Sequence, residues 1–339
     1  MKKIAKRTLT IVLIAGMIAA ALPMAAMGGV ELSEDTDTAT QSLTSDTPEY
    51  QEEEYSEEEE FPEDGYYEEA VEEGETYGMA KSVFHEDQAK GNGRCKIDSS
   101  EAHLGYVGVA ATESSRLKFQ VIKGSSTYNY DMPNDGTPVF FPLQSGNGSY
   151  TLRVMKNITG TKYSVAYSTS CKVTLEDEFQ PFIRPNNYVN YDEYSECVQK
   201  AAQLRAESAD DLEFVTKVYK LICKTVRYDR QKAKTVQSGY LPVPDETLST
   251  GKGICFDYAS LAASMLRSQG IPTKVIFGYV SPKGAYHAWN MFYTEQTGWI
   301  TVNYEVSGDW TRMDLTYSAN GKHPDFIGDG DNYADVYCY

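Results

Sequence analysis

Histidine is scarce in this chain, which has only His85, His103, His287 and His323 among its 339 residues. The six cysteines form no C-x-x-C pair, and cysteine and histidine together show no zinc-like spacing. The acidic run "GDGDN" at 328–332 lacks the spacing of an EF-hand. These absences argue against zinc modules, dithiol redox centres and EF-hands. We therefore expect no metal and no cofactor.

Long apolar runs are also rare, and the one that is long enough to matter opens the chain. Four basic residues within positions 2–7 precede an apolar stretch that ends in small residues near positions 25–29. This is the pattern of a secretory signal peptide, predicted at 1–29, and the alternative is an uncleaved membrane anchor. No cysteine ends the run, which disfavours a lipid anchor. We expect a secreted or cell-surface protein with no stable membrane span after signal cleavage.

Basic residues are absent from positions 31–80, which hold 20 of the 49 acidic residues. From residue 81 onward the chain has 29 acidic and 27 basic residues, so the net charge of −18 belongs mostly to this one segment. Self-repulsion and a shortage of aliphatic side chains predict a disordered linker over 30–80. The acidic balance also predicts no nucleic-acid partner.

Residues 81–178 show the period of two that is typical of strands. The runs "RLKFQVIKG", "SYTLRVMKN" and "KYSVAYSTS" alternate apolar and polar residues, with the turn signals "PNDGTP", "SGNGS" and "NITGT" between them. Short strands at this spacing predict a small antiparallel β-sandwich-like domain. Nothing in it has a catalytic pattern, and His103 is expected at its surface. A disulfide between Cys95 and Cys171 is one option, but the sequence assigns no pairing.

Residues 179–339 open with a proline-containing connector, after which the period changes to 3.6. Helices are predicted in "YSECVQKAAQLRAES" and "DDLEFVTKVYKLICKTVRYD", followed by a long loop, "KTVQSGYLPVPDETLSTGKG". A third helix begins near Cys255 and has one apolar stripe between Tyr258 and Leu266. The strands "TKVIFGYV", "YHAWNMFYT" and "GWITVNYEV" come next. This order predicts an α+β domain in which a helix packs on an antiparallel sheet.

Cys255 follows a Gly-Lys-Gly turn and lies in the first turn of its predicted helix. Unpaired N–H groups and the positive end of the helix dipole favour a thiolate there. His287 lies 32 residues later on a predicted strand, and a helix-to-strand return of this length can bring it beside the thiol. Such a pair performs acyl transfer, because the thiolate attacks a carbonyl and the imidazolium protonates the leaving amine. On pattern alone, a core cysteine and an unrelated histidine remain the alternative.

A third group must orient the histidine in such a site. Asn303 in "WITVNYE" and Asp314 in "WTRMDLTY" are the two candidates, and each follows a tryptophan by four residues. A carboxylate stabilises the imidazolium better than an amide does, although papain-like enzymes use asparagine. Both residues stay candidates on this argument.

The runs "GKGICFDYASLAASMLRSQGIPTKVIFGYV", "HAWN" and "WTRMDLT" together resemble the core of the transglutaminase-like superfamily, over roughly residues 208–318. That family is similar to papain in its Cys–His–Asp site, and shows a G-x-C-x-x-[FY]-A run, an H-A-W strand and a W-x-x-x-D-P-T strand. The resemblance implies a transglutaminase-like domain over 179–339 with Cys255 as nucleophile, His287 as base and Asp314 as the third member. Leu315 replaces the proline of the family pattern, while Asn303 has the commoner family spacing.

The resemblance implies a thiol enzyme that acts on amide bonds of a peptide or protein substrate, which can be cell-wall associated, and the signal peptide implies that the enzyme is exported. An amine that resolves the thioester gives a cross-link, whereas water gives deamidation or proteolysis. The backbone N–H of Cys255 is the expected oxyanion donor, and Tyr240 is a candidate for a second one. The alternative function is a non-catalytic binding or scaffold module on the same fold. Such a module usually loses its cysteine or histidine, and both are present here.

Overall fold

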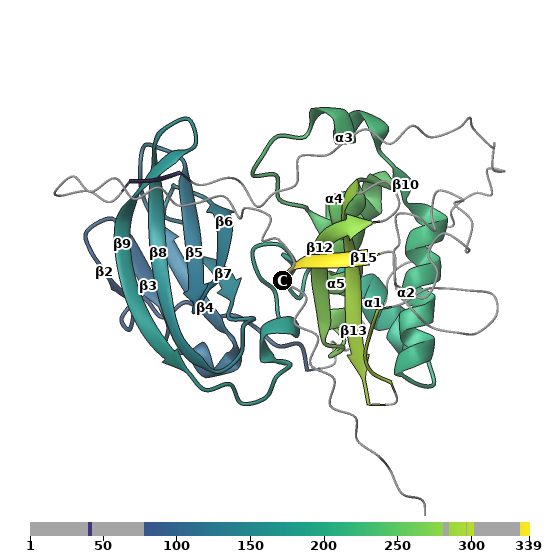
Figure 1. The fold of residues 1–339 in the computed structure, drawn as a ribbon. Coiled ribbons are helices and arrows are strands. Elements are labelled where there is room, and N and C mark those ends of the chain that lie inside the picture. The colour runs from purple at the N-terminus through teal and green to yellow at the C-terminus, as the bar shows by residue number, and fades with distance from the viewer. Residues whose placement is uncertain (1–39, 43–77, 281–284, 296, 302–332) are drawn as a thin grey trace, which may run out of the picture.

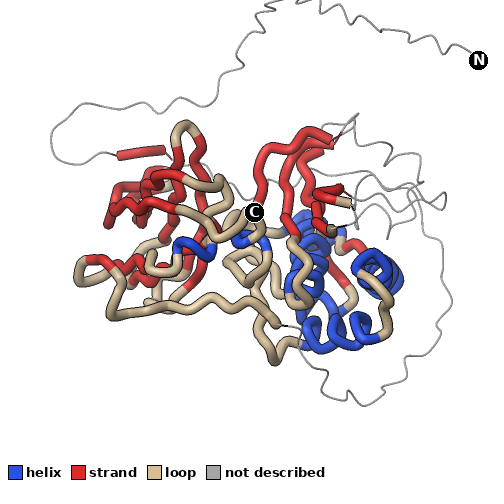
Figure 2. The backbone as a smooth tube through the Cα atoms, turned by 90° about the horizontal axis from the view of Figure 1, so that it is seen from below, coloured by secondary structure: helices blue, strands red, loops and turns tan. Residues whose placement is uncertain are grey.

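The computed structural model of the chain describes residues 40–42, 78–280, 285–295, 297–301 and 333–339. A strand-rich part comes first and a helical part with its own sheet follows, and the two lie side by side (Figures 1 and 2). None of the helices in these residues is both long and apolar enough to cross a membrane. The fold is therefore mixed, and antiparallel sheets precede a helical core.

The strand-rich part contains two antiparallel sheets, with the strand orders β1-β9-β8-β5-β6 and β2-β3-β4-β7. The predicted runs "RLKFQVIKG", "SYTLRVMKN" and "KYSVAYSTS" fall in β5, β8 and β9. The bounds of the strands are β1 Thr40–Ser42, β2 Lys90–Gly91, β3 Cys95–Asp98, β4 Tyr106–Ala111, β5 Leu117–Lys123, β6 Ser126–Met132, β7 Val139–Pro142, β8 Gly148–Thr159 and β9 Lys162–Val173. A short 3-10 helix, η1, spans Ala102–Leu104.

The alternation of apolar and polar residues gives the two sheets a common core. Leu117, Phe119 and Val121 of β5 are almost completely buried. The ring of Phe119 lies 4.6 Å from that of Phe141 on β7, which belongs to the other sheet. Burying side chains of this size contributes about 1.5–3 kcal/mol each. The two sheets therefore pack face to face, while the boundary predicted near residue 178 stays a prediction.

The helical part opens with η2 (Gln180–Phe182), α1 (Glu196–Ala206) and α2 (Asp211–Thr225). The two α-helices lie where the 3.6-residue period predicts them. Asp210 caps α2, because its carboxylate accepts the N–H of Glu213 at 2.8 Å. The buried residues of α2 are Phe214, Val215, Val218, Tyr219 and Ile222.

Two further helices interrupt the region around the predicted long loop. They are α3 (Arg230–Thr235) and α4 (Pro244–Thr250). Pro244 is pre-set for the first position of α4, and Gly251 ends the helix with φ of 62°. The prediction of one long loop was therefore wrong over α4, because Pro244 begins a helix there. Irregular backbone remains over residues 236–243, which we call loop 236–243.

Helix α5 (Cys255–Arg267) lies at the centre of the helical part. The sequence predicts one apolar stripe, but all 13 of its residues are buried. Helices α1, α2 and α4 pack against it, and so do strands β12 and β13 (Figure 1). Its serines fit this setting because their hydroxyls bond backbone carbonyls: Ser260 Oγ donates to Tyr188 at 2.7 Å. The alanines and serines of α5 let other elements pack closely on every side of the helix. The stripe of large apolar residues in the sequence does not predict this all-round burial.

An antiparallel sheet of order β14-β13-β12-β15 packs on α5, and a short parallel pair, β10 and β11, precedes the helix. Arg267 Nε at the end of α5 donates to Thr273 O at the start of β12, so β12 returns along the helix and β13 runs back beside it. The first residues of β13 therefore lie near the start of α5. The bounds are β10 Arg227–Tyr228, β11 Lys252–Gly253, β12 Thr273–Val280, β13 Ala285–Thr294, β14 Gly298–Thr301 and β15 Tyr333–Cys338.

The connector between the two parts is buried. Arg184 is 4% exposed and donates to the carbonyl of Lys81 at 2.9 Å. The ring of Tyr188 lies 5.2 Å from that of Tyr130 on β6 and 5.2 Å from that of Phe256 on α5. One cluster of buried residues thus extends from the strand-rich part to α5.

All six cysteines lie in the described residues, and all are free thiols. Cys95 is on β3 and Cys171 is on β9, which belong to different sheets. The disulfide considered between them is therefore not formed.

Candidate active site

Cys255 is the first residue of α5 and is 2% exposed. The first N–H groups of a helix have no acceptor within the helix, so the N–H of Cys255 is directed out of its N-terminal end. Strand β11 leads into this turn, where Gly253 pairs with Tyr228 of β10. A Cβ on Gly253 would lie 2.7 Å from the Cβ of Asp257, so the approach of the chain to the helix requires glycine here.

A buried carboxylate two residues after Cys255 organises the start of α5. Asp257 has no exposed surface and accepts the N–H of Ile254 at 2.8 Å, the hydroxyl of Tyr240 at 2.5 Å and the ammonium of Lys232 at 2.9 Å. Burial, and then the charge of Asp257, raises the pKa of the Tyr240 hydroxyl, which therefore stays protonated and donates. We call Lys232, Tyr240 and Asp257 the charged cluster.

Strand β13 places His287 at the same end of the helix–sheet layer as Cys255. Asn290 Nδ2 donates to Ala259 O at 2.9 Å, one helical turn beyond Cys255. Because β13 runs in the direction of α5, His287, three residues before Asn290, lies level with the start of the helix. Its side chain is buried, with 6% of the residue exposed. His287 is thus level with the start of α5 along the layer, and its pairing with Cys255 stays a prediction.

The alternation along β13 decides which face of the sheet each residue takes. Asn290 and Ala288 face α5, so His287 and Trp289 lie on the other face. Gly278 of β12 is the cross-strand neighbour of His287, so no side chain stands beside the imidazole on that strand. The imidazole of His287 therefore lies on the face of the sheet that carries Trp289.

The third member of the predicted triad stays a prediction. Asp314 and Asn303 both lie outside the described residues, as do His323 and the acidic run at 328–332. His103 is exposed on η1, beside Glu101 and Glu176, as the sequence predicts. Trp289 is buried.

Loop 236–243 joins the start of α5 to the strand-rich part. Arg116 Nη2 donates to Ser238 O at 3.1 Å and pairs with Asp131 of β6 at 2.6 Å. Gly239 has φ of 89°, and a Cβ there would lie 2.6 Å from Arg116 Nη2. The next residue, Tyr240, bonds Asp257. A chain of contacts therefore runs from β6 to the residue two positions after Cys255.

A cavity of about 640 Å³ lies beside this loop, between the two parts of the molecule. Cavities of this size hold small ligands or short peptide segments. Its walls combine amide side chains with proline and aromatic surfaces, which suits hydrogen bonding to peptide groups as well as apolar contact. They include Asn186, Asn187, Asn190, Phe140, Pro185 and Pro242.

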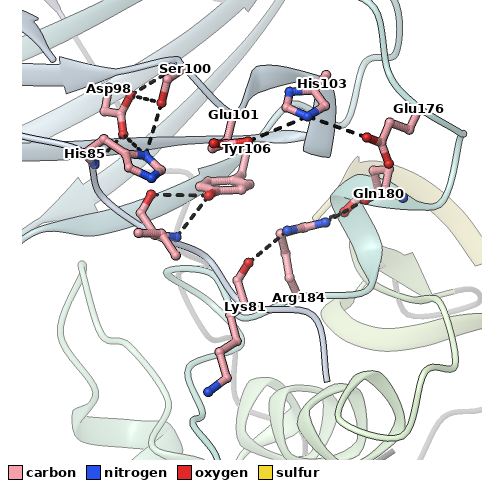
Figure 3. Close-up of polar contacts among 11 residues, drawn as sticks. Lys81, His85, Asp98, Ser100, Glu101, His103, Tyr106, Glu176, Gln180 and Arg184 are labelled. Carbon is pink, nitrogen blue, oxygen red and sulfur yellow. Dashed lines mark hydrogen bonds and ion pairs between the residues drawn. The ribbon is translucent and has the colours of Figure 1, made fainter. Parts of the chain in front are cut away.

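Serine, histidine and aspartate also meet in the strand-rich part, where Figure 3 shows Ser100, His85 and Asp98. Ser100 Oγ lies 3.2 Å and Asp98 Oδ2 lies 3.3 Å from the same ring nitrogen, His85 Nδ1. A serine triad needs the two partners on different ring nitrogens. Asp98 also accepts the backbone N–H groups of His85 and Ser100, so the set fastens segment 81–85 to β3 rather than forming a second active site.

The charged cluster is the part of the site that sequence reasoning missed. Asp257 stands in "CFDY", directly after Cys255 and Phe256, but its burial and its two side-chain partners are not visible in one sequence. Tyr240, considered as an oxyanion donor, has its hydroxyl on Asp257 instead. An acidic residue at the third position of a helix is the one local signal, since it commonly accepts the N–H before the helix.

Comparison with known proteins concerns this same region. The family model of the transglutaminase-like superfamily matches residues 198–304. A protein-glutamine gamma-glutamyltransferase of Pseudomonas aeruginosa is 31% identical over 93 residues, which are 23% of this chain and 14% of that protein. A UPF0252 protein of Methanocaldococcus jannaschii is 28% identical over 118 residues, which are 33% of this chain and 32% of that protein. The chain therefore spans less than a third of the length of these relatives.

Among solved structures, the periplasmic domain of TgpA from Pseudomonas aeruginosa aligns with 69% of this chain and 76% of that domain, at 16% identity and a TM-score of 0.30. A score this low carries no argument about function, so the assignment rests on the family model. Members of this superfamily are typically cysteine enzymes. The matched segment contains Cys255 and His287. Residues 198–304 of the chain thus match the family model of the transglutaminase-like superfamily.

Proposed function

We propose that the protein is an exported thiol enzyme that acts on amide bonds of peptides or proteins. The observation that supports this most directly is the position of Cys255 at the start of α5 with His287 at the same end of the layer, inside the family segment. Export is proposed from the signal-peptide pattern at 1–29. The third member of the site is Asp314 in this proposal, with Asn303 as its rival.

The reaction has two steps on Cys255. The thiolate attacks the carbonyl carbon of an amide, the C–N bond breaks, and the leaving amine takes a proton from the imidazolium of His287. A second nucleophile, water or an amine, then attacks the thioester and gives its proton to the imidazole. The C–S bond breaks, and the thiolate returns. The N–H of Cys255 donates to the oxyanion in both steps.

An extended peptide is the substrate that the surroundings suit best. The cavity beside loop 236–243 has amide side chains that pair with peptide groups, and prolines that contact apolar side chains. Loop 236–243 forms one of its walls and also reaches Asp257, near the nucleophile. We place the part of the substrate remote from the reacting amide in this cavity.

The rival is a non-catalytic binding or scaffold module. Its supporting observation is that Cys255 is only 2% exposed, as a core cysteine would be. The two proposals differ in what the thiol does. An enzyme needs it for turnover, whereas a scaffold needs only its volume.

Turnover by wild type and Cys255→Ala separates these proposals. Each protein is incubated with a glutamine-containing protein and a labelled primary amine, and amine incorporation, ammonia release and peptide fragments are followed by mass spectrometry. Incorporation that depends on Cys255 means a transglutaminase, and fragments or deamidation without incorporation mean a hydrolase. Cys197→Ala is the matched control, since Cys197 is also buried at a helix start. Equal results for wild type and Cys255→Ala on several substrates support the scaffold.

The same assay tests the third member. Asp314→Asn is expected to lower turnover by about 10⁴-fold, because the imidazole loses its orienting charge. Asn303→Ala should leave most of the activity. A large loss in Asn303→Ala and a small one in Asp314→Asn would transfer the role to Asn303.

A further inference from the structure

We propose that the charged cluster of Asp257, Lys232 and Tyr240 has a positioning role: it holds the start of α5 in place and balances the charge beside Cys255. The proposal rests on the proposed function in one respect, that Cys255 is the reactive thiol. None of the three residues is offered as a group that touches the substrate.

The geometry begins with the carboxylate of Asp257. It lies inside the protein, two residues from the thiol, and each of its oxygens is occupied: Oδ1 by Tyr240, and Oδ2 by Lys232 and the N–H of Ile254. Asp257 thus binds the N–H before Cys255 and leaves that of Cys255 for an oxyanion.

The charges explain why a lysine belongs to the cluster. A lone carboxylate this close to Cys255 disfavours a thiolate, because like charges repel strongly where water is excluded. Lys232 compensates that charge at 2.9 Å and also lies 4.5 Å from the centre of the Tyr240 ring. Lys232 and Asp257 together therefore add almost no net charge beside the thiol of Cys255. Removing one partner leaves a net charge beside Cys255, and the sign depends on which partner is removed.

The cluster also ties the nucleophile to the rest of the molecule. Lys232 comes from α3 and Tyr240 from loop 236–243, whose Ser238 accepts from Arg116 at the edge of the strand-rich part. A chain of contacts therefore runs from Arg116 through loop 236–243 to the carboxylate of Asp257.

Other titratable groups around the start of α5 stay unchanged in the test. They include His287 on β13, Glu246 on α4, Lys252 on β11, Tyr228 on β10 and Asp229 just before α3. Because every variant keeps them, differences between variants report on Lys232 and Asp257.

The experiment measures the rate of Cys255 alkylation by iodoacetamide against pH in the full-length protein, with the modified residue identified by mass spectrometry. In Lys232→Met the midpoint of the profile should rise, and in Asp257→Asn it should fall, each by about 0.5–1.5 pH units at effective dielectric constants of about 20–80. The double variant should return close to wild type. Lys217→Met is the matched control, because Lys217 is similarly exposed and pairs with Glu213 on α2.

If the cluster has only a structural role, the alkylation midpoints of Lys232→Met and Asp257→Asn shift in the same direction, or both equal the midpoint of Lys217→Met. Either result overturns the proposal. Where Asp257→Asn does not fold, Lys232→Met and Tyr240→Phe still decide: the first must raise the midpoint, and the second must move it less. A wild-type Cys255 that resists alkylation up to high pH overturns the proposed function as well. A reactive Cys255 with unmoved midpoints overturns the positioning role of the charged cluster alone.

Discussion

Cys197 and Cys255 occupy the same kind of place, a buried position in the first turn of a helix, in α1 and α5 respectively. Asp245 accepts the N–H groups of Glu196 and Cys197 at 3.0 and 2.9 Å. Burial, and then the charge of Asp245, raises the pKa of the Cys197 thiol well above its ordinary value. At α5 the carboxylate of Asp257 takes the N–H of Ile254 instead and is paired with Lys232.

The comparison shows that a helix start does not by itself make a cysteine reactive. At α1 the carboxylate occupies the N–H groups that would stabilise a thiolate and adds an opposing charge. At α5 the carboxylate of Asp257 binds the N–H of the residue before the cysteine and carries the counter-charge of Lys232. We therefore expect the surroundings of the helix end to decide whether a cysteine is structural or reactive.

The largest expected effect concerns the histidine that Cys255 shares its helix end with. His287→Ala should lower turnover by about 10²–10⁴-fold, because the proton transfer to the leaving amine loses its donor. Steady-state kinetics would measure this loss, on a substrate identified with the assay of wild type and Cys255→Ala. His103→Ala is the control, as this residue is exposed on η1, and an equal loss in both variants would contradict the assignment.

The two thiols should also differ in direct reactivity. At pH 7 we expect Cys255 to react with iodoacetamide at least about 10²-fold faster than Cys197, because the raised pKa of Cys197 leaves almost no thiolate. Peptide mapping of the alkylated, folded protein gives the ratio. Comparable labelling of the two sites would remove the contrast between them.

A smaller effect is expected when the carboxylate of α1 is changed. Asp245→Asn should lower the free energy of unfolding by about 1 kcal/mol, because it weakens the two hydrogen bonds at the start of the helix. Urea denaturation measures this change. Glu246→Gln, on the neighbouring exposed residue of α4, is the control. Asp245→Asn should also speed alkylation of Cys197, and a slower reaction would contradict the role given to Asp245.

The smallest effect is a pH dependence of stability that belongs to Cys197. Its folded pKa is raised, so its contribution is complete below the unfolded value of about 8.5 and is lost as the pH rises above it. The free energy of unfolding should therefore fall with pH above about 8.5, by up to about 1.4 kcal/mol per unit from this group. Cys197→Ala should show a shallower fall in urea titrations at pH 8 to 10. Parallel curves would mean that the thiol does not contribute.

Much of the secondary structure could be predicted, because it depends on neighbours in the chain. The period of two in β5, β8 and β9 and the period of 3.6 in α2 indicate half-buried strands and an amphipathic helix. Helix α4 was missed, since Pro244 at its start and Gly251 at its end also occur in loops. The all-round burial of α5 was missed as well, because it depends on what packs against its small residues.

The sequence by itself determined the order of helices and strands, the position of Cys255 at a helix start and the motif that marks the transglutaminase-like segment. These depend on local periodicity, turn residues and spacing. Only the tertiary structure decided that Asp257 is joined by Lys232 and Tyr240, that His287 and Trp289 take the face of β13 that is turned away from α5, and that Cys197 meets Asp245. Such contacts depend on strand register and on packing between residues far apart in the chain, which no local pattern encodes.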